Sequence, residues 1–248
     1  MMLLAIARHE LRRIFMTPLA WIILAVFQVL IAITFFTLAD QYQRGISAFV
    51  NHGLTIIVVA GTLQSAGLLL LFITPYLGMR LISEERRSGT LTLLLSSPVS
   101  LWEIVGGKYL GMLGFCLVLL LLAGLLPLSL ATGTRLDYGL LAAGMLGLLL
   151  LSAVFTAIGM FASTLTRQPV AAAFLAFTLV FIFWILHILG NTDNAILNQV
   201  IAYLSLQRHF NNLLSGLVST YDVVYFFLLG GVFTLLSILR LEGIRRYN

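Results

Sequence analysis

Charged side chains are scarce in this 248-residue chain, and its long apolar stretches contain none. Only 9% of the residues are Asp, Glu, Lys or Arg, whereas soluble domains average about 25%. With 60% hydrophobic residues and a mean hydropathy of +1.07, a water-soluble globular fold is excluded. The chain is expected to fold inside a membrane.

Cysteine is equally scarce, because Cys116 is the single one. It can form no disulfide within the chain and belongs to no metal-binding spacing, so we expect a small core residue. The seven Met residues are dispersed, and the four His residues fall on different segments: His9, His52, His187 and His209. The sequence therefore predicts no metal site and no catalytic Ser/His/Asp constellation, which disfavours an intramembrane enzyme.

An ATP-binding loop is also missing. Gly107-Lys108 is the only Gly-Lys pair, but Trp102 stands where the Walker pattern needs glycine and Tyr109 follows the lysine. Intramembrane carboxylates are expected to be absent too, although proton- and ion-coupled carriers usually keep ionisable groups on their pathways. If the chain transports a substrate, a separate ATPase is the expected energy source.

What the chain does contain is six apolar stretches long enough to cross a bilayer as helices. The first follows a basic segment, but it is longer than a signal-peptide core and is interpreted as a retained span. The prediction is an all-α polytopic membrane protein with a single domain over 1–248. The predicted spans are 18–39, 54–79, 109–131, 138–163, 170–190 and 223–239.

The basic residues are distributed unequally between the two sides of these spans. Eleven of the 14 Lys and Arg residues fall in the N-terminal segment, the second and fourth loops and the C-terminal tail. The other side has only Arg44, Arg135 and Arg208. The positive-inside bias predicts that both termini are cytoplasmic, and it accounts for the net charge of +5 without a nucleic-acid partner.

Residues 2–17 have the pattern of an amphipathic helix that would lie along the membrane surface as an elbow before the first span. Thr17-Pro18 is expected to turn the chain into that span. One face is expected to carry Leu3, Ala7, Leu11, Ile14 and Phe15, with Arg8, Glu10, Arg12 and Arg13 elsewhere.

The second loop is a polar segment that is expected to be helical. Gly89 should end the helix that emerges from the second span, and a short helix is predicted over 90–96. Ser100 and Glu103 have capping-box spacing for a further helix leading into the third span.

The largest segment on the other side, 191–222, has helical periodicity that predicts two short outer helices. Gly216 is expected to end the second of them, and Asp222 to cap span six. Gly107 with Gly111, and Ala143 with Gly147, have small-xxx-small spacing. We expect packing within one subunit there rather than a dimer seam.

Residues 85–99, ERRSGTLTLLLSSPV, together with six spans and the amphipathic elbow, resemble permease subunits of type-2 ABC transporters of the export class. A second set of residues resembles the gliding-motility GldF-like branch of that family: His209-Phe210, residues 215–218, residues 222–226 and the Arg245-Arg246-Tyr247 tail. The first resemblance covers nearly the whole chain. Membership of the branch names no substrate.

This resemblance implies a non-catalytic permease in the bacterial inner membrane, paired with a second copy as a homodimer and with two ABC ATPase subunits that bind ATP and Mg. The second loop would be the coupling helix that docks on the ATPase. The docking residues would be Glu85, Arg86, Arg87, Gly89, Thr90, Leu91, Leu94, Ser97 and Pro98.

Two alternatives stay open within the ABC interpretation. One is a permease serving a periplasmic metalloenzyme, as in nitrous-oxide-reductase maturation, although the outer segment shows no clustering of Cys or Met. The other is a non-transporting ABC complex that transmits ATP-driven movement to a periplasmic accessory protein. The substrate stays unassigned.

Overall fold

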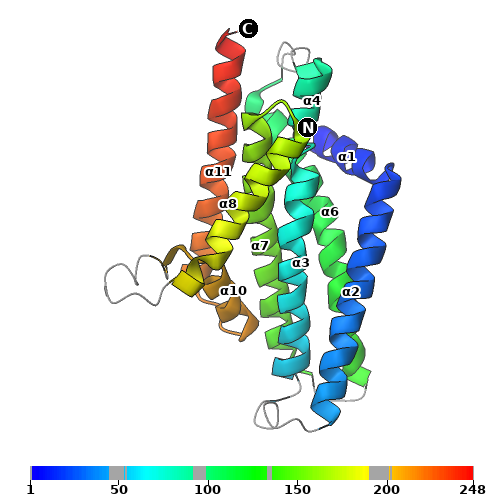
Figure 1. Ribbon diagram of the computed structural model, residues 1–248. Coiled ribbons are helices and arrows are strands. Elements are labelled where there is room, and N and C mark those ends of the chain that lie inside the picture. Colours follow the sequence, from blue (N-terminus) through cyan, green and yellow to red (C-terminus); the bar gives the residue numbers. More distant parts are fainter. Residues whose placement is uncertain are drawn as a thin grey trace.

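The computed structural model describes residues 2–44, 53, 55–91, 99–132, 136–189, 201 and 203–247. Across these residues the chain is helical and contains no strand, which confirms the predicted all-α fold. Six helices have the length and apolarity needed to cross a membrane. Together they form an elongated bundle (Figure 1).

The six predicted spans correspond to helices that extend beyond the predicted bounds. Span two is a short π-helix, η1 (Thr55–Ala60), that continues into α3. Span three is followed by a 3₁₀ turn, η2 (Leu130–Thr132). The spans are α2 (Pro18–Gln43), α3 (Gly61–Gly78), α6 (Leu101–Ser129), α7 (Tyr138–Leu165), α8 (Pro169–Leu189) and α11 (Thr220–Tyr247).

Three shorter helices connect or flank the spans. The elbow helix α1 (Met2–Phe15) precedes α2, and Pro18 stands at the start of α2, where its missing N–H costs nothing. The helix α4 (Ser83–Ser88) follows α3 after a tight turn, and α10 (Leu206–Leu214) precedes α11. The two termini and α4 lie at one end of the bundle, which we call the loop end (Figure 1).

Local signals in the sequence account for several helix boundaries. The Ser100 hydroxyl accepts from the Glu103 N–H while the Glu103 carboxylate accepts from Ser100, so the predicted capping box is confirmed as the start of α6. Asp137 caps α7 through the N–H groups of Gly139 and Leu140. Gly89 and Gly216 end α4 and α10 with φ of +76° and +82°, as predicted, because glycine adopts this conformation without a steric cost.

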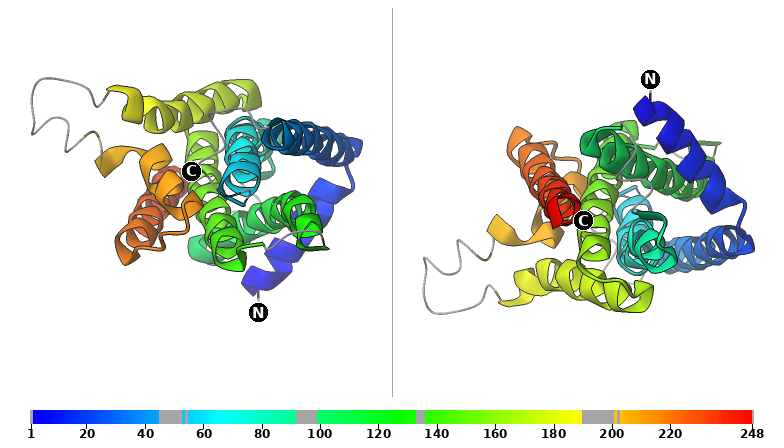
Figure 2. Two further views of the ribbon diagram at one scale, coloured as in Figure 1. Left: turned by 90° about the horizontal axis from the view of Figure 1, so that it is seen from below. Right: turned by 90° about the horizontal axis from the view of Figure 1, so that it is seen from above.

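The core of the bundle is α7, which contacts α3, α6, α8, α10 and α11 and lies among them in the end-on views (Figure 2). Small residues along α7 permit this close approach. A Cβ on Gly78 of α3 would lie 3.0 Å from the Cα of Gly159, so these two helices touch through their backbones. By contrast, α2 and α8 expose most of their apolar side chains, as helices that face lipid do.

Three expectations require correction. Glu10 was placed away from the apolar face of the elbow helix, but it is 3% exposed and lies in the middle of the buried face. The spans were expected to contain no acidic residue, but α11 begins at Thr220 and includes Asp222. Asp222 is not a cap either: it is the third residue of α11, and the Ser219 hydroxyl accepts from the Tyr221 N–H at this helix start.

Candidate functional site

The predicted docking segment begins on α4, at the loop end. Arg87, Gly89 and Thr90 are exposed there, while Leu91 is buried against the core. The Ser88 and Thr90 hydroxyls lie 2.8 Å apart and bond across the end of the helix. Leu94, Ser97 and Pro98 lie outside the described residues, as does most of the predicted helix 90–96.

The other two predicted docking charges turn inward. Lys108 of α6 lies 2.6 Å from the Glu85 carboxylate and 3.5 Å from the Glu10 carboxylate of the elbow helix. Glu10 also accepts from Arg13 at 2.7 Å. Lys108 and Glu10 are 4% exposed and Glu85 is 17% exposed, so this is a nearly dry network that joins α1, α4 and α6.

A second set of bonds joins α4 to α7. The Ser163 hydroxyl accepts from the backbone N–H groups of Ile82 and Ser83 and donates to the Met79 carbonyl at 3.0 Å. The Arg86 guanidinium donates to the Thr164 carbonyl at 2.6 Å. The turn between α3 and α4 is thus bonded directly to the central helix, and α4 is linked to three other helices.

The elbow helix docks on α6 through glycine. A Cβ on Gly107 would lie 2.7 Å from the Cβ of Ile6, and one on Gly111 would lie 2.9 Å from the Ala7 carbonyl oxygen. Only glycine leaves room for α1 this close to α6, and this approach brings Glu10 to Lys108. The expectation that this glycine pair packs within the subunit is confirmed, and Gly147 likewise packs against Leu213 of α10.

A second buried polar cluster lies at the start of α11. His209 Nδ1 is 2.5 Å from the Asp222 carboxylate, and His209 Nε2 is 2.9 Å from the Tyr203 carbonyl oxygen. The Asn212 amide donates to the same carboxylate, at 3.3 Å. The His209 ring stacks on Tyr225 with 4.1 Å between ring centres, and both members of the pair are at most 3% exposed.

The hydrogen-bond partners of His209 determine its proton inventory. The Tyr203 carbonyl can only accept, so Nε2 carries a proton. Nδ1 and the carboxylate oxygen each present a lone pair, so a separation of 2.5 Å requires a proton between them. The pair therefore has no net charge, which makes its burial affordable.

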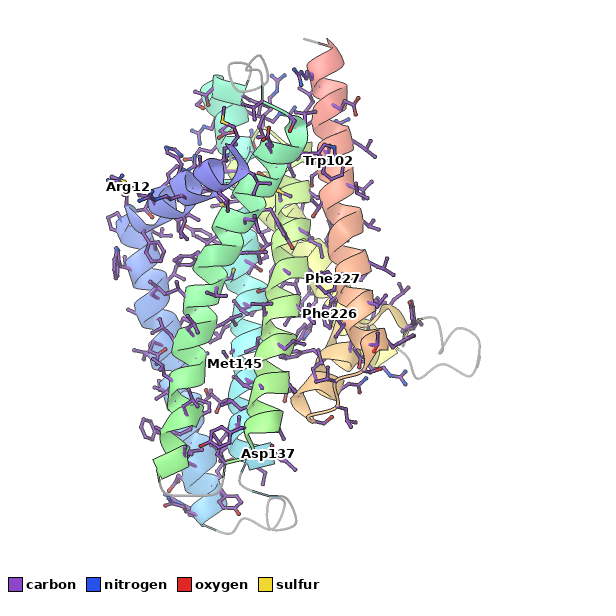
Figure 3. All side chains as sticks on the ribbon, turned by 180° about the vertical axis from the view of Figure 1, so that it is seen from behind. Arg12, Trp102, Asp137, Met145, Phe226 and Phe227 are labelled. Atoms are coloured by element: carbon purple, nitrogen blue, oxygen red, sulfur yellow. The ribbon has the colours of Figure 1, made fainter. Side chains whose placement is uncertain are left out.

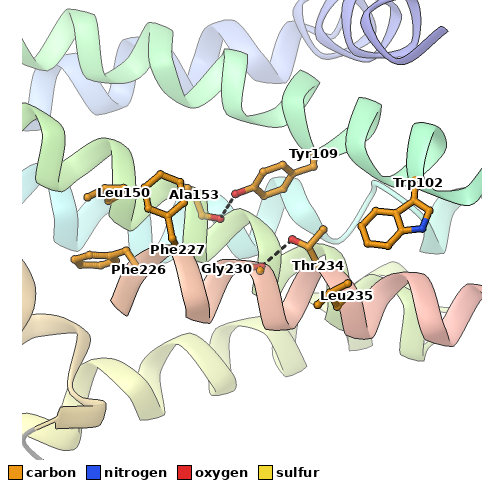
Figure 4. A pocket seen from close by; sticks show the side chains of 10 residues that line it. Trp102, Tyr109, Leu150, Ala153, Phe226, Phe227, Gly230, Thr234 and Leu235 are labelled. Carbon is orange, nitrogen blue, oxygen red and sulfur yellow. Dashed lines mark hydrogen bonds between the residues drawn. The ribbon is translucent and has the colours of Figure 1, made fainter. Parts of the chain in front are cut away.

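A groove between α6, α7 and α11 is the largest apolar opening with described walls. It encloses about 440 Å³ and is lined by Tyr109, Phe226 and Phe227 among others, with Trp102 near the loop end (Figures 3 and 4). The Tyr109 hydroxyl donates to the Ala153 carbonyl, and the Thr234 hydroxyl donates to the Gly230 carbonyl. These internal bonds leave an apolar surface that suits lipid-like or protein apolar groups.

Metal and cysteine chemistry find no support in the part of the chain that the structure describes. No group of three His, Cys, Asp or Glu side chains occurs there. Cys116 is fully buried in α6, with its sulfur 4.0 Å from the Thr156 hydroxyl, as expected for a core residue.

Sequence reasoning missed both buried clusters, although the sequence carried signals for them. Position 10 continues the helical series 3, 7, 11 and 14, so Glu10 belonged on the buried face. Lys108 was assigned to a loop because span three was started at Tyr109, after the capping box had already opened that helix. His209 and Asp222 flank the turn at Gly216, and antiparallel helices joined by so short a turn bring such positions together.

A protein-family model described as "ABC-2 family transporter protein" matches residues 4–241. This match covers nearly the whole chain, from the elbow helix to the far part of α11. No curated protein matches the chain.

Proposed function

The chain belongs to the ABC-2 transporter family, and from this premise we propose that it is the membrane-spanning subunit of an ATP-driven exporter. The family supports a transport permease that spans the membrane several times, and it implies an ABC ATPase partner. In this proposal the ATPase binds ATP and Mg, and the permease has no ATP site of its own. The exposed part of α4 and the adjoining residues receive the movement of the ATPase.

One observation carries this proposal: α4 is joined to α1, α6 and α7 by buried charges and by bonds to backbone. Lys108 joins α4 to the elbow helix and to α6, while Ser163 and Arg86 join it to α7. Since α7 contacts most of the other spans, a displacement of α4 would reach the whole bundle. A flexible loop would absorb such a displacement instead.

Docking on the ATPase then falls to the exposed residues. Arg87, Gly89 and Thr90 are free of the bundle surface, whereas Glu85 and Arg86 hold α4 in place. Leu94, Ser97 and Pro98 complete the proposed docking segment. Glu85 and Arg86 would affect the ATPase chiefly by positioning α4.

The proposed orientation places the loop end in the cytoplasm of a bacterium, with the chain in the inner membrane. The loop end gathers both termini and most of the Arg and Lys residues, as the positive-inside rule expects of a cytoplasmic side (Figure 1).

We propose a homodimer of permeases on two ATPase subunits, with room for a periplasmic accessory protein at the opposite end. Assignment to the GldF-like branch rests on the residues of the second resemblance. Three of these, His209, Asp222 and Tyr225, form the buried cluster at the start of α11.

The test uses the single cysteine of the chain. In a Cys116→Ala background, cysteines are introduced at Arg87 and Thr90 on α4, and at Leu217 near the turn before α11 as the matched control. All three positions are exposed. Position 217 should react in intact cells with a membrane-impermeant thiol reagent, whereas positions 87 and 90 should react only after the cells are opened.

The same variants test the partner. With a cognate ABC ATPase, positions 87 and 90 should cross-link to the ATPase in an ATP-dependent manner, and position 217 should not. Cross-linking from position 217 alone would overturn both the orientation and the docking surface. A permease that copurifies with no ABC ATPase would overturn the exporter proposal.

A further inference from the structure

A small polar cavity lies beneath the elbow helix, apart from the docking segment and from the apolar groove. It encloses about 190 Å³ between α1, the start of α2, the end of α3 and α4. Its walls are of two kinds, charged on one side and aliphatic on the other. The lining residues are Glu10, Arg13, Ile14, Thr17, Leu19, Leu77, Arg80, Leu81 and Glu84.

Two of its charges, Arg80 and Glu84, have no ion-pair partner within the described part of the chain. They are four residues apart, a spacing at which opposite charges pair on a continuous helix. Here the turn between α3 and α4 interrupts the helix, and no salt bridge joins them. The Arg80 guanidinium lies over the Tyr76 ring, 5.7 Å from its centre, while Arg13 is already paired with Glu10.

The depth of the cavity is that of the lipid headgroups. The elbow helix runs across the ends of the spans instead of along them (Figure 2). Trp21, one turn into α2, is 61% exposed, and its indole N–H donates to the Phe15 carbonyl at 3.1 Å. Exposed Trp residues with one polar bond are typical of the membrane–water interface.

We propose that this cavity binds the headgroup of an ethanolamine phospholipid from the leaflet at the loop end. The phosphate would lie on Arg80 and the ammonium on Glu84, so one zwitterion bridges two charges that the chain leaves apart. Leu19, Leu77 and Leu81 supply an apolar wall for the glycerol and the first acyl carbons. The bound lipid would hold the elbow helix against the turn between α3 and α4, whatever substrate the protein carries.

The headgroup chemistry makes the proposal selective. A primary ammonium donates hydrogen bonds to a carboxylate, whereas choline has no N–H, and phosphatidylglycerol has no cation for Glu84. The ethanolamine lipid should therefore bind more tightly than the choline or glycerol lipid.

The experiment measures binding of short-chain phosphatidylethanolamine, phosphatidylcholine and phosphatidylglycerol to the purified full-length chain by native mass spectrometry. The unaltered chain should prefer phosphatidylethanolamine by about tenfold, which corresponds to about 1.4 kcal/mol. Arg80→Gln should weaken all three lipids, because each has a phosphate. Glu84→Gln should abolish the preference for ethanolamine over choline.

The matched control is Arg12→Gln, which removes one positive charge from the same elbow helix, on the side turned away from the bundle (Figure 3). It should leave lipid binding unchanged. Free phosphoethanolamine serves as a competitor: weak competition assigns the site to the lipid, and full competition at equal concentration would show a solute site and overturn the lipid assignment. Equal affinity for the three lipids, or equal losses in Arg12→Gln and Arg80→Gln, would also overturn the proposal.

Discussion

The two buried ionic clusters are built differently. The cluster at the loop end joins residues far apart in the sequence, since Lys108 meets a carboxylate 98 positions away and another 23 positions away. The cluster at the start of α11 is local, because His209 and Asp222 are 13 positions apart. One ties separate helices together, and the other fixes a single helical hairpin.

They differ also in how they can respond to a change. The Lys108 ammonium stands between fixed carboxylates and holds α1, α4 and α6 together, so its removal leaves uncompensated charge. The His209–Asp222 pair shares a proton that can be lost or retained by one partner. A non-local network should therefore be costlier to break than a local one.

Lys108→Met should have the largest effect. It leaves the Glu10 and Glu85 carboxylates buried without their cation, and breaking a buried pair in this way costs about 3–5 kcal/mol. The free energy of unfolding, measured by SDS titration of the purified chain, should fall by that amount. Arg12→Gln, on the exposed side of the same elbow helix, should leave it unchanged.

The control for this effect is the triple variant Glu10→Gln/Lys108→Met/Glu85→Gln, which removes all three charges. It should recover most of the lost stability, since replacing a whole buried network is far less costly than breaking it. A triple variant as unstable as the single one would show that packing of the lysine stem, not charge, holds the three helices.

Asp222→Asn should cost less, about 2–3 kcal/mol in the same titration. The amide cannot balance a protonated His209, but the histidine can give up a proton and keep its bond to the Tyr203 carbonyl, so the loss is close to that of unsatisfied hydrogen bonds. The double variant His209→Phe/Asp222→Asn retains the stack on Tyr225 and should be more stable than Asp222→Asn alone. A loss equal to that of Lys108→Met would remove the distinction between local and non-local clusters.

Ser163→Ala should cost about 2 kcal/mol and act on the loop end alone. It leaves the buried N–H groups of Ile82 and Ser83 without their acceptor. Hydrogen exchange should rise in the turn between α3 and α4 but not around α10. Ser152→Ala, whose hydroxyl bonds only within α7, is the matched control and should leave the turn protected.

Gly111→Ala should have the smallest effect, about 1 kcal/mol. The new methyl group collides with Glu10 and the Ala7 carbonyl, and overpacking costs about 1–3 kcal/mol, but alanine recovers up to about 1 kcal/mol of helix propensity. Gly231→Ala on α11, where a Cβ meets no atom within 4 Å, should be neutral or stabilising in the same titration. If the two substitutions behave alike, close docking of α1 on α6 does not govern the network.

The sequence was sufficient for those parts of the molecule that local physics determines. Span positions follow from apolar length, the start of α6 follows from Ser100 and Glu103, and the ends of α4 and α10 follow from Gly89 and Gly216. These features depend on residues a few positions apart, so a single sequence contains all that is needed to predict them.

The interior charges could not be placed in the same way. Glu10 and Lys108 look like surface residues of a positive loop end, and their burial depends on glycines of α6 that let α1 approach. Likewise, Glu85 and Arg86 were expected to face a partner, but contacts with α6 and α7 turn them inward. Whether they also influence docking stays a prediction, because tertiary contacts reveal where a charge lies and not what a second protein does with it.

The shared proton of His209 and Asp222 also bears on how the chain enters the membrane. A carboxylate near the middle of an inserting helix carries a penalty of about 2.5–3.5 kcal/mol. Because its partner lies across one short turn, α10 and α11 can meet as a hairpin before the rest of the bundle is present. The hairpin then presents that acid to the bilayer as half of an electrically neutral pair, so biosynthesis of the last span need not wait for any other helix.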